Sequence, residues 1–167
     1  MRIPALILLS LCLLGAVQAA WYAPELPERP ASSFGGDGVA NGWSDKDSFL
    51  AMQIALLVLT AGLFLLIGWL LPRIPVRWIN LPHPQYWLDG TRRAATLAAV
   101  SRSLAWFGCV TTLFLLWTFQ ITILANLADP PRMPAAVFWS GFVAYMAYST
   151  WWTLRLILRY QRLPSRG

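Results

Sequence analysis

The chain has 167 residues, of which 57% are hydrophobic and only 12% are charged. Soluble globular domains carry about 25% charged residues, so this composition excludes an ordinary water-soluble domain and indicates a protein that contacts lipid. The net charge of +6 would suit nucleic-acid binding in a soluble protein, but here its distribution follows membrane topology. We therefore expect the lipid bilayer, and no nucleic acid, as a partner.

Residues 1–19 have the pattern of a secretory signal peptide. Arg2 precedes an apolar core from Leu6 to Val17, and Val17-Gln18-Ala19 resembles a signal-peptidase site. The apolar core is shorter than the about 20 residues that a membrane span needs. We expect cleavage after Ala19. The alternative is an uncleaved signal anchor, which adds a fourth span to the three predicted below.

Residues 20–48 change character abruptly, since they are rich in proline and then in glycine. Such a segment buries too little apolar area to offset its conformational entropy, so a flexible, extended or disordered periplasmic segment is expected. The cluster Gly35-Gly36-Asp37-Gly38 is no phosphate loop, because no strand precedes it and no Gly-Lys-Ser/Thr follows it.

The first mature span is predicted at residues 49–71. From Phe49 to Leu71 the chain runs for 23 residues without a charge, and a helix of that length crosses a bilayer. Ser44 or Asp45 is expected to cap this helix, with Asp47 in its first turn. Pro72 should end it.

Residues 72–103 are predicted to form a cytoplasmic interfacial loop followed by the basic start of a long helix. Pro82 and Pro84 fix φ and bias Leu81 and His83 toward extended conformations, so this stretch should not be helical. Asp89 or Thr91 is expected to cap a helix that runs from Arg92 to about Leu127, with residues 104–127 inside the membrane. A short periplasmic turn at 128–134, a span at 135–158 and a basic cytoplasmic tail at 159–167 complete the chain.

Orientation follows from the basic residues. Arg2, the 72–103 segment and the stretch from Arg155 onward hold ten of the thirteen cations, whereas the other segments hold six of the seven acids. The positive-inside rule then places the mature N-terminus in the periplasm and the C-terminus in the cytoplasm. The predicted class is an all-α, multi-pass protein of a bacterial inner membrane with three transmembrane helices after a signal peptide.

The segment from Trp78 to Leu88 is the candidate interaction loop. Its aromatic side chains have apolar bodies and polar edges, which suit the headgroup region. Three interpretations stay open: a structural segment on the inner leaflet, a docking surface for a partner subunit, and a small-molecule site. The candidate residues are Trp78, Asn80, Leu81, Pro82, His83, Pro84, Tyr86, Trp87, Arg92 and Arg93.

The chain offers little material for catalysis or metal binding. His83 is its only histidine, and Asp89 and Cys109 do not complete a zinc site at credible spacing. A single histidine also excludes a bis-histidine haem within one chain, and no Ser/His/Asp constellation is recognisable. No catalytic, metal or cofactor-binding residues are therefore assigned, no cofactor is expected, and the predicted role is non-enzymatic. Cys12 and Cys109 are too few for a disulfide framework.

Small and hydroxylated residues recur at helical spacing in the last two spans. Such residues let helices approach closely and hydrogen-bond across an interface. The predicted helix-packing residues are Gly108, Thr111, Thr118, Thr122, Ser140, Gly141 and Ala144. A transport path is a weaker interpretation, because these spans contain no Asp, Glu or Lys for ion coupling.

The loop carries a resemblance as well. Asn80-Leu81-Pro82, Tyr86-Trp87-Leu88 and Arg92-Arg93 before a long helix resemble uncharacterised small bacterial membrane proteins of the DUF1648-type grouping, in which an Asn-Leu-Pro-x-x-x-Tyr-Trp-Leu loop follows the first span. The resemblance covers about residues 50–160. It departs at Asp89-Gly90-Thr91, where Ala-Pro-Glu is expected, and at the extra N-terminal segment. It implies no catalytic residues.

These patterns together predict an accessory or scaffolding subunit of a membrane complex. Its partner would be another membrane protein or a second copy in a homo-oligomer. One alternative is an immunity or signalling protein in which residues 20–48 sense an extracytoplasmic ligand. The other is a transporter or membrane-enzyme component.

Overall fold

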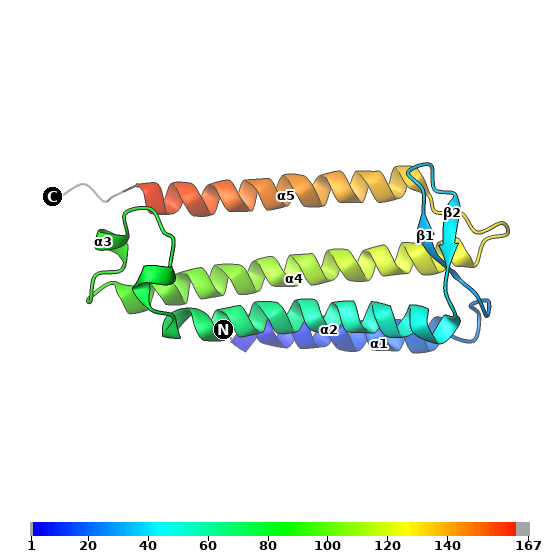
Figure 1. The fold of residues 1–167 in the computed structure, drawn as a ribbon, viewed down its shortest axis with the longest axis horizontal. Coiled ribbons are helices and arrows are strands. Elements are labelled where there is room, and N and C mark those ends of the chain that lie inside the picture. Colours follow the sequence, from blue (N-terminus) through cyan, green and yellow to red (C-terminus); the bar gives the residue numbers. More distant parts are fainter. Residues whose placement is uncertain (1, 163–167) are drawn as a thin grey trace.

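The computed structural model describes residues 2–162 as four long helices that run side by side (Figure 1). The long helices are α1 (Arg2–Tyr22), α2 (Lys46–Leu70), α4 (Arg93–Asn126) and α5 (Ala135–Gln161). The shorter elements are β1 (Ala31–Phe34), β2 (Ala40–Trp43), the 3₁₀ turns η1 (Leu71–Arg73) and η2 (Val76–Trp78), and α3 (Pro84–Trp87). Residues 163–167 of the predicted basic tail lie outside the described residues.

Three of these helices are long and apolar enough to cross a membrane: α1, α2 with its extension to Arg73, and α4. This confirms a mostly helical protein that has helices long and apolar enough to span a membrane. The predicted spans at 49–71 and 104–127 lie within α2 with its extension and at the C-terminal part of α4. The third predicted span, 135–158, corresponds to α5, which is less apolar and is not among the three.

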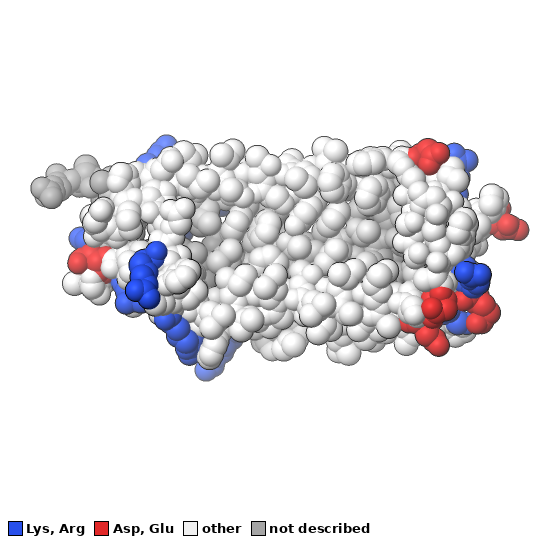
Figure 2. Space-filling model, in the orientation of Figure 1, with Lys and Arg blue, Asp and Glu red and all other residues white. Residues whose placement is uncertain are grey.

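Charged side chains gather at the two ends of the bundle, and the long middle of the visible face is free of them (Figure 2). We call the end with η1, η2, α3, the start of α4 and the last turns of α5 the basic end. The opposite end, with the strands and the α4–α5 turn, is the acidic end. This separation reproduces in three dimensions the charge asymmetry of the sequence, since the start of α1 and the end of α5 lie toward the basic end (Figure 1).

Helices α1, α2 and α4 form the packed core. Leu8 of α1 is fully buried against Ala61 of α2 and Cys109 of α4. Farther along the bundle, Leu57 packs against Leu116 and Phe119. Helix α1 belongs to the core through Leu8, and it continues through Ala19 to Tyr22 without a break. Cleavage after Ala19 would remove Leu8 from that core. The cleavage itself stays a prediction.

A polar network links α1 to α4 inside the bundle. The Gln18 amide donates to Gln120 Oε1 at 2.6 Å, and Gln120 Nε2 donates to the Tyr22 hydroxyl at 3.1 Å. Polar groups removed from water are costly without partners. The three side chains satisfy one another, so they also fix how α1 is rotated against α4.

Helix α5 lies along one side of α4 and is joined to it by aromatic contacts. The rings of Phe107 and Trp152 stack with centroids 4.4 Å apart, and Phe114 stacks on Tyr145 at the same distance. Within the described helix Ala135–Gln161, only Tyr160 is buried. Helix α5 therefore forms an outer layer held mainly by a strip of rings.

Residues 20–48 are folded, which contradicts the predicted flexible segment. They contain two β-strands, so the fold is not all-α. Strands β1 and β2 pair antiparallel, and Gly38 (φ 81°) makes the positive-φ turn between them. An isolated two-stranded hairpin is marginally stable. This one gains partners from the bundle: Met133 N–H donates to Gly38 O at 2.9 Å, and Val39 bridges to Arg132. Composition alone does not reveal such long-range support.

The two predicted helix caps have different outcomes. Asp45 caps α2 as expected, because its carboxylate accepts from Ser48 N–H at 2.8 Å, and this bond lowers the pKa of Asp45. The side-chain cap expected at Asp89 or Thr91 is wrong. Helix α4 begins after Arg92 without a side-chain cap, and the backbone carbonyl of Asp89 accepts from Arg92 and Arg93 N–H instead.

Candidate interaction surface at the basic end

The inner side of the candidate interaction loop is attached to the end of α5. Trp87 Nε1 donates to Tyr160 O at 2.8 Å, and the two rings meet edge to face with centroids 5.3 Å apart. Tyr86 packs edge to face on Trp87 at 5.0 Å. Leu88 is buried beside them, 7% exposed. Two of the predicted interaction residues, Tyr86 and Trp87, therefore hold the loop in place.

Arginines at the start of α4 fix the other flank of the loop. Arg93 Nη2 donates to Ile74 O at 3.2 Å, which ties α4 to the chain just before η2. The guanidinium of Arg92 lies 4.2 Å from the centre of the Tyr86 ring and 3.9 Å from Asp89 Oδ2. A cation over an aromatic face is attracted to it. These contacts give the loop a defined shape.

The outer side of the loop is open. Trp78 is 73% exposed, which is the largest exposed fraction among the large hydrophobic side chains of the described residues. Asn80, His83 and Pro84 are exposed as well, whereas Leu81 and Pro82 are half-buried. The sequence-predicted residues thus divide into an anchoring set and an outward set, and the loop presents the second on a scaffold made by the first.

His83 adopts a conformation that the sequence did not predict. Its φ of 51° lies in the left-handed region, not in the extended one. Pro84 opens α3, so the residue before it is kept out of the right-handed helical region; histidine is among the residues that tolerate the left-handed alternative. No group of three His, Cys, Asp or Glu side chains that could hold a metal occurs within residues 2–162.

The predicted helix-packing residues do not form a single interface. A Cβ placed on Gly108 would lie 2.5 Å from Phe64 of α2, whereas one on Gly141 would overlap the Trp117 ring of α4. Thr111 Oγ1 lies 3.0 Å from Tyr145 Oη of α5. The remaining members bond within their own helices or face outward. Thr118, Thr122 and Ser140 donate to carbonyls of their own helices, and Ala144 is exposed.

Asn126 is the residue whose structural role the sequence does not reveal. Its side-chain oxygen accepts from Ala31 N–H at 2.6 Å, and its side-chain amide donates to Ala31 O at 3.0 Å. The residue is 4% exposed. An asparagine at the end of an apolar helix was the available signal, but its partner is 95 residues away in the sequence. The amide therefore pairs with β1 as a neighbouring strand would.

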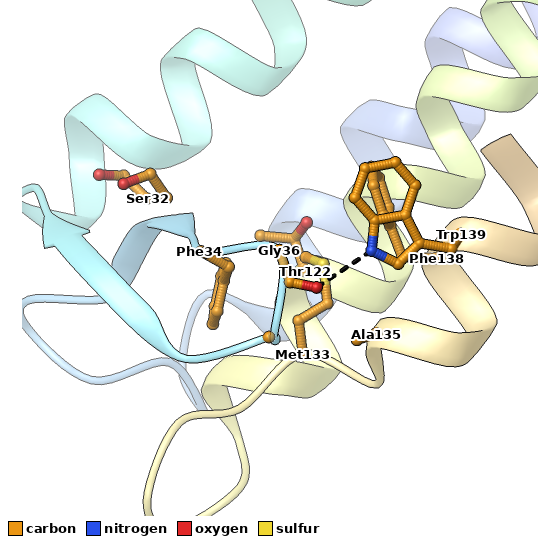
Figure 3. A pocket seen from close by; sticks show the side chains of 11 residues that line it. Ser32, Phe34, Gly36, Thr122, Met133, Ala135, Phe138 and Trp139 are labelled. Atoms are coloured by element: carbon orange, nitrogen blue, oxygen red, sulfur yellow. Dashed lines mark hydrogen bonds between the residues drawn. The ribbon is translucent and has the colours of Figure 1, made fainter.

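A cavity of about 530 Å³ lies at the acidic end between the hairpin and the start of α5 (Figure 3). Phe34 and Phe138 line it, and Trp139 Nε1 donates to Gly36 O at 3.1 Å along its edge. The turn does not cradle an anion, since Gly38 N–H and Val39 N–H are already bonded to Gly35 O and Asp37 Oδ1. Ser32, Thr122 and Met133 also line this cavity.

Comparison of the chain with protein-family models, with curated proteins and with solved structures finds no match. The resemblance of the Asn80–Leu88 stretch to DUF1648-type membrane proteins therefore stays a prediction. The arrangement itself defines a class: a helical bundle with membrane-spanning dimensions and a shaped aromatic loop at one end. At the other end lies a folded cap, made of β1, β2 and the α4–α5 turn.

Proposed function

We propose that this chain is an integral protein of a bacterial inner membrane, with the basic end in the cytoplasm and the cap in the periplasm. The charge-free middle of the bundle and the excess of arginine at one end support this placement (Figure 2). Residues 135–154 of α5 carry no charge, which supports α5 as a further span. The burial of Leu8 and the Gln18–Gln120 bond support retention of α1 as an uncleaved anchor.

Within that placement, the proposed role is non-enzymatic: the protein is an accessory or scaffolding subunit that docks a membrane-protein partner, or a second copy, through the outer side of the loop. The observation that carries this proposal is the exposure of Trp78 on a loop whose inner side is held by Trp87 and Arg93. Tryptophan dominates many binding interfaces. A surface that is already ordered loses little entropy on binding.

Site-specific photo-crosslinking in native membranes tests this role. A photoreactive residue at position 80, beside Trp78, should form a discrete adduct with one protein. Trp78→Ala should weaken that adduct by roughly 30-fold, as expected for a central interface residue worth about 2 kcal/mol. The matched control places the photoreactive residue at Val39, which is 48% exposed at the acidic end. Equal adducts from both positions, or an adduct that survives Trp78→Ala, would contradict the proposal.

A further inference from the structure

A second surface at the basic end lies apart from the loop, between α4 and α5. A cavity of about 530 Å³ opens there, and three arginines and three tryptophans make up most of its wall. Arg102 and Trp106 come from α4; Trp151, Trp152, Arg155 and Arg159 come from α5. The helical spacing of these residues places them along one side of the helix pair. We call this side the α4–α5 groove.

The positive charge of the α4–α5 groove is not neutralised by the protein. Within residues 2–162 the ion pairs are Lys46–Glu28 and Arg92–Asp89, so Arg102, Arg155 and Arg159 take part in none. Asp89, the only acid near this end of the described chain, does not line the cavity. Arg155 instead lies over the Trp151 ring, 5.2 Å from its centre. The groove thus offers guanidinium groups to an anion that comes from outside the chain.

The same side of the helix pair continues into an apolar section. A second cavity of about 530 Å³ is lined by Val110, Phe114 and Trp117 of α4 and by Gly141 and Tyr148 of α5, among others. Tyr148 lines both cavities, so the two are consecutive. From Val110 to Trp117 the apolar section extends about 10 Å along α4. That length fits within one leaflet, which is about half of a 30 Å hydrocarbon core.

We infer that the α4–α5 groove is a binding site for an anionic phospholipid of the inner leaflet. The phosphate pairs with Arg102, Arg155 and Arg159, and one acyl chain lies against Phe114 and Gly141. Arginine forks match phosphate oxygens in geometry, and basic pockets between membrane helices bind anionic headgroups. The inference rests on the proposed membrane placement. The apolar continuation favours a lipid over free phosphate, since a free ion makes no use of it.

Native mass spectrometry of the full chain in detergent tests the inference, with phosphatidylglycerol as the probe and phosphatidylcholine as the neutral comparison. The wild-type chain should retain phosphatidylglycerol preferentially, in a single-copy adduct that millimolar inorganic phosphate does not displace. The triple variant Arg102→Gln/Arg155→Gln/Arg159→Gln should raise the apparent Kd on the order of 100-fold, the equivalent of about 1 kcal/mol for each arginine.

Two matched variants separate this site from general surface charge. Arg2→Gln/Arg73→Gln/Arg77→Gln removes the same charge at the same end but outside the groove, and it should leave the adduct unchanged. Ala144→Trp places a ring in the apolar section at an exposed position, and it should remove the lipid while keeping all three arginines. Equal loss in both triple variants, or full binding by Ala144→Trp, would overturn the inference. Crosslinking from position 80 is measured separately, so the proposed docking role can fail while the lipid site stands.

Discussion

At the scale of single residues, Asn126 connects α4 to the hairpin through its side-chain amide. Its side-chain amide presents one N–H donor and one acceptor oxygen to Ala31 in the spacing of a peptide group, and the amide nitrogen also donates to Thr122 O at 3.0 Å. The Asn126 side chain in the last turn of α4 therefore pairs with β1 as the backbone of a neighbouring strand would. This replaces part of the pairing that β1 lacks, because a two-stranded sheet leaves the outer backbone groups of each strand open.

Replacing Asn126 by leucine keeps the size of the side chain and removes its two bonds to Ala31 as well as its bond to Thr122 O. Ala31 N–H and C=O lose their partners, and each buried unpaired group costs about 1–3 kcal/mol. We expect a lower thermal midpoint in detergent and faster hydrogen–deuterium exchange confined to residues 31–43. Asn80→Leu is the control, since that amide is exposed at the other end. Unchanged exchange of the hairpin in Asn126→Leu would show that the bond is dispensable.

Sequence reasoning has a clear limit at this scale. It places Trp78 and His83 in one proline-stiffened aromatic segment because proline chemistry is local, and it does not predict the short helices η2 and α3. It does not distinguish Trp87, which is bonded to Tyr160, from Trp78, which is exposed. That difference depends on where α5 ends in space. Local pattern therefore identifies the candidate loop, and only the tertiary contacts assign its inner and outer sides.

At the scale of helices, glycines decide how closely the layers approach. Gly141 faces the Trp117 ring, so the α4–α5 distance depends on the missing Cβ. Gly62, in α2, has nothing within 4 Å of the position that a Cβ would take. Both glycines lie inside long helices, but a Cβ would be crowded at Gly141 and free at Gly62. The two positions can therefore be compared directly.

Gly141→Ala should destabilise the bundle, because the added methyl group forces Trp117 or α5 to move, at a cost of about 1–3 kcal/mol. Gly62→Ala should leave stability unchanged or raise it by up to about 1 kcal/mol, since alanine is the better helix former. Thermal unfolding of both variants in the same detergent measures the difference. A Gly141→Ala variant as stable as Gly62→Ala would mean that α5 is not tightly held by α4.

The helices were also the elements that the sequence predicted best. The long uncharged run predicts α2, and Pro72 marks its end to within two residues. The hairpin was missed because its stability comes from Asn126 and residues 132–133. The sequence predicts a cleavable signal where the structure has α1, since length and the Ala19 motif are local features. Its packing against α2 and α4 could not be seen from them.

At the scale of the whole molecule, charge is sorted by end. The basic end holds arginines from four separate segments of the chain, whereas six of the seven acids lie at the other end or in its cap. The four long helices alternate in direction, so the start of α1 and the end of α5 lie toward the same end of the bundle (Figure 1). The proposed topology therefore requires both that α1 is retained and that α5 is inserted.

Reporter fusions and intact mass test this topology together. An alkaline phosphatase fused after Arg162 should be inactive, and one fused in the turn after Pro131 should be active, because only the second reaches the periplasm. The purified protein should retain the full mass of 18.7 kDa. Loss of residues 1–19 from the mature protein, or activity of the C-terminal fusion, would refute the four-span arrangement.

The bond between Asn126 and Ala31 also sets an order of events during synthesis. The hairpin leaves the ribosome before α4, so in the proposed placement it would reach the periplasm while β1 still lacks the amide that completes it. The cap closes only when the far end of α4 arrives on the same side. A complete cap therefore requires that α4 has been synthesised as far as Asn126. A chain that stalls before residue 126 would leave the backbone groups of Ala31 without this partner.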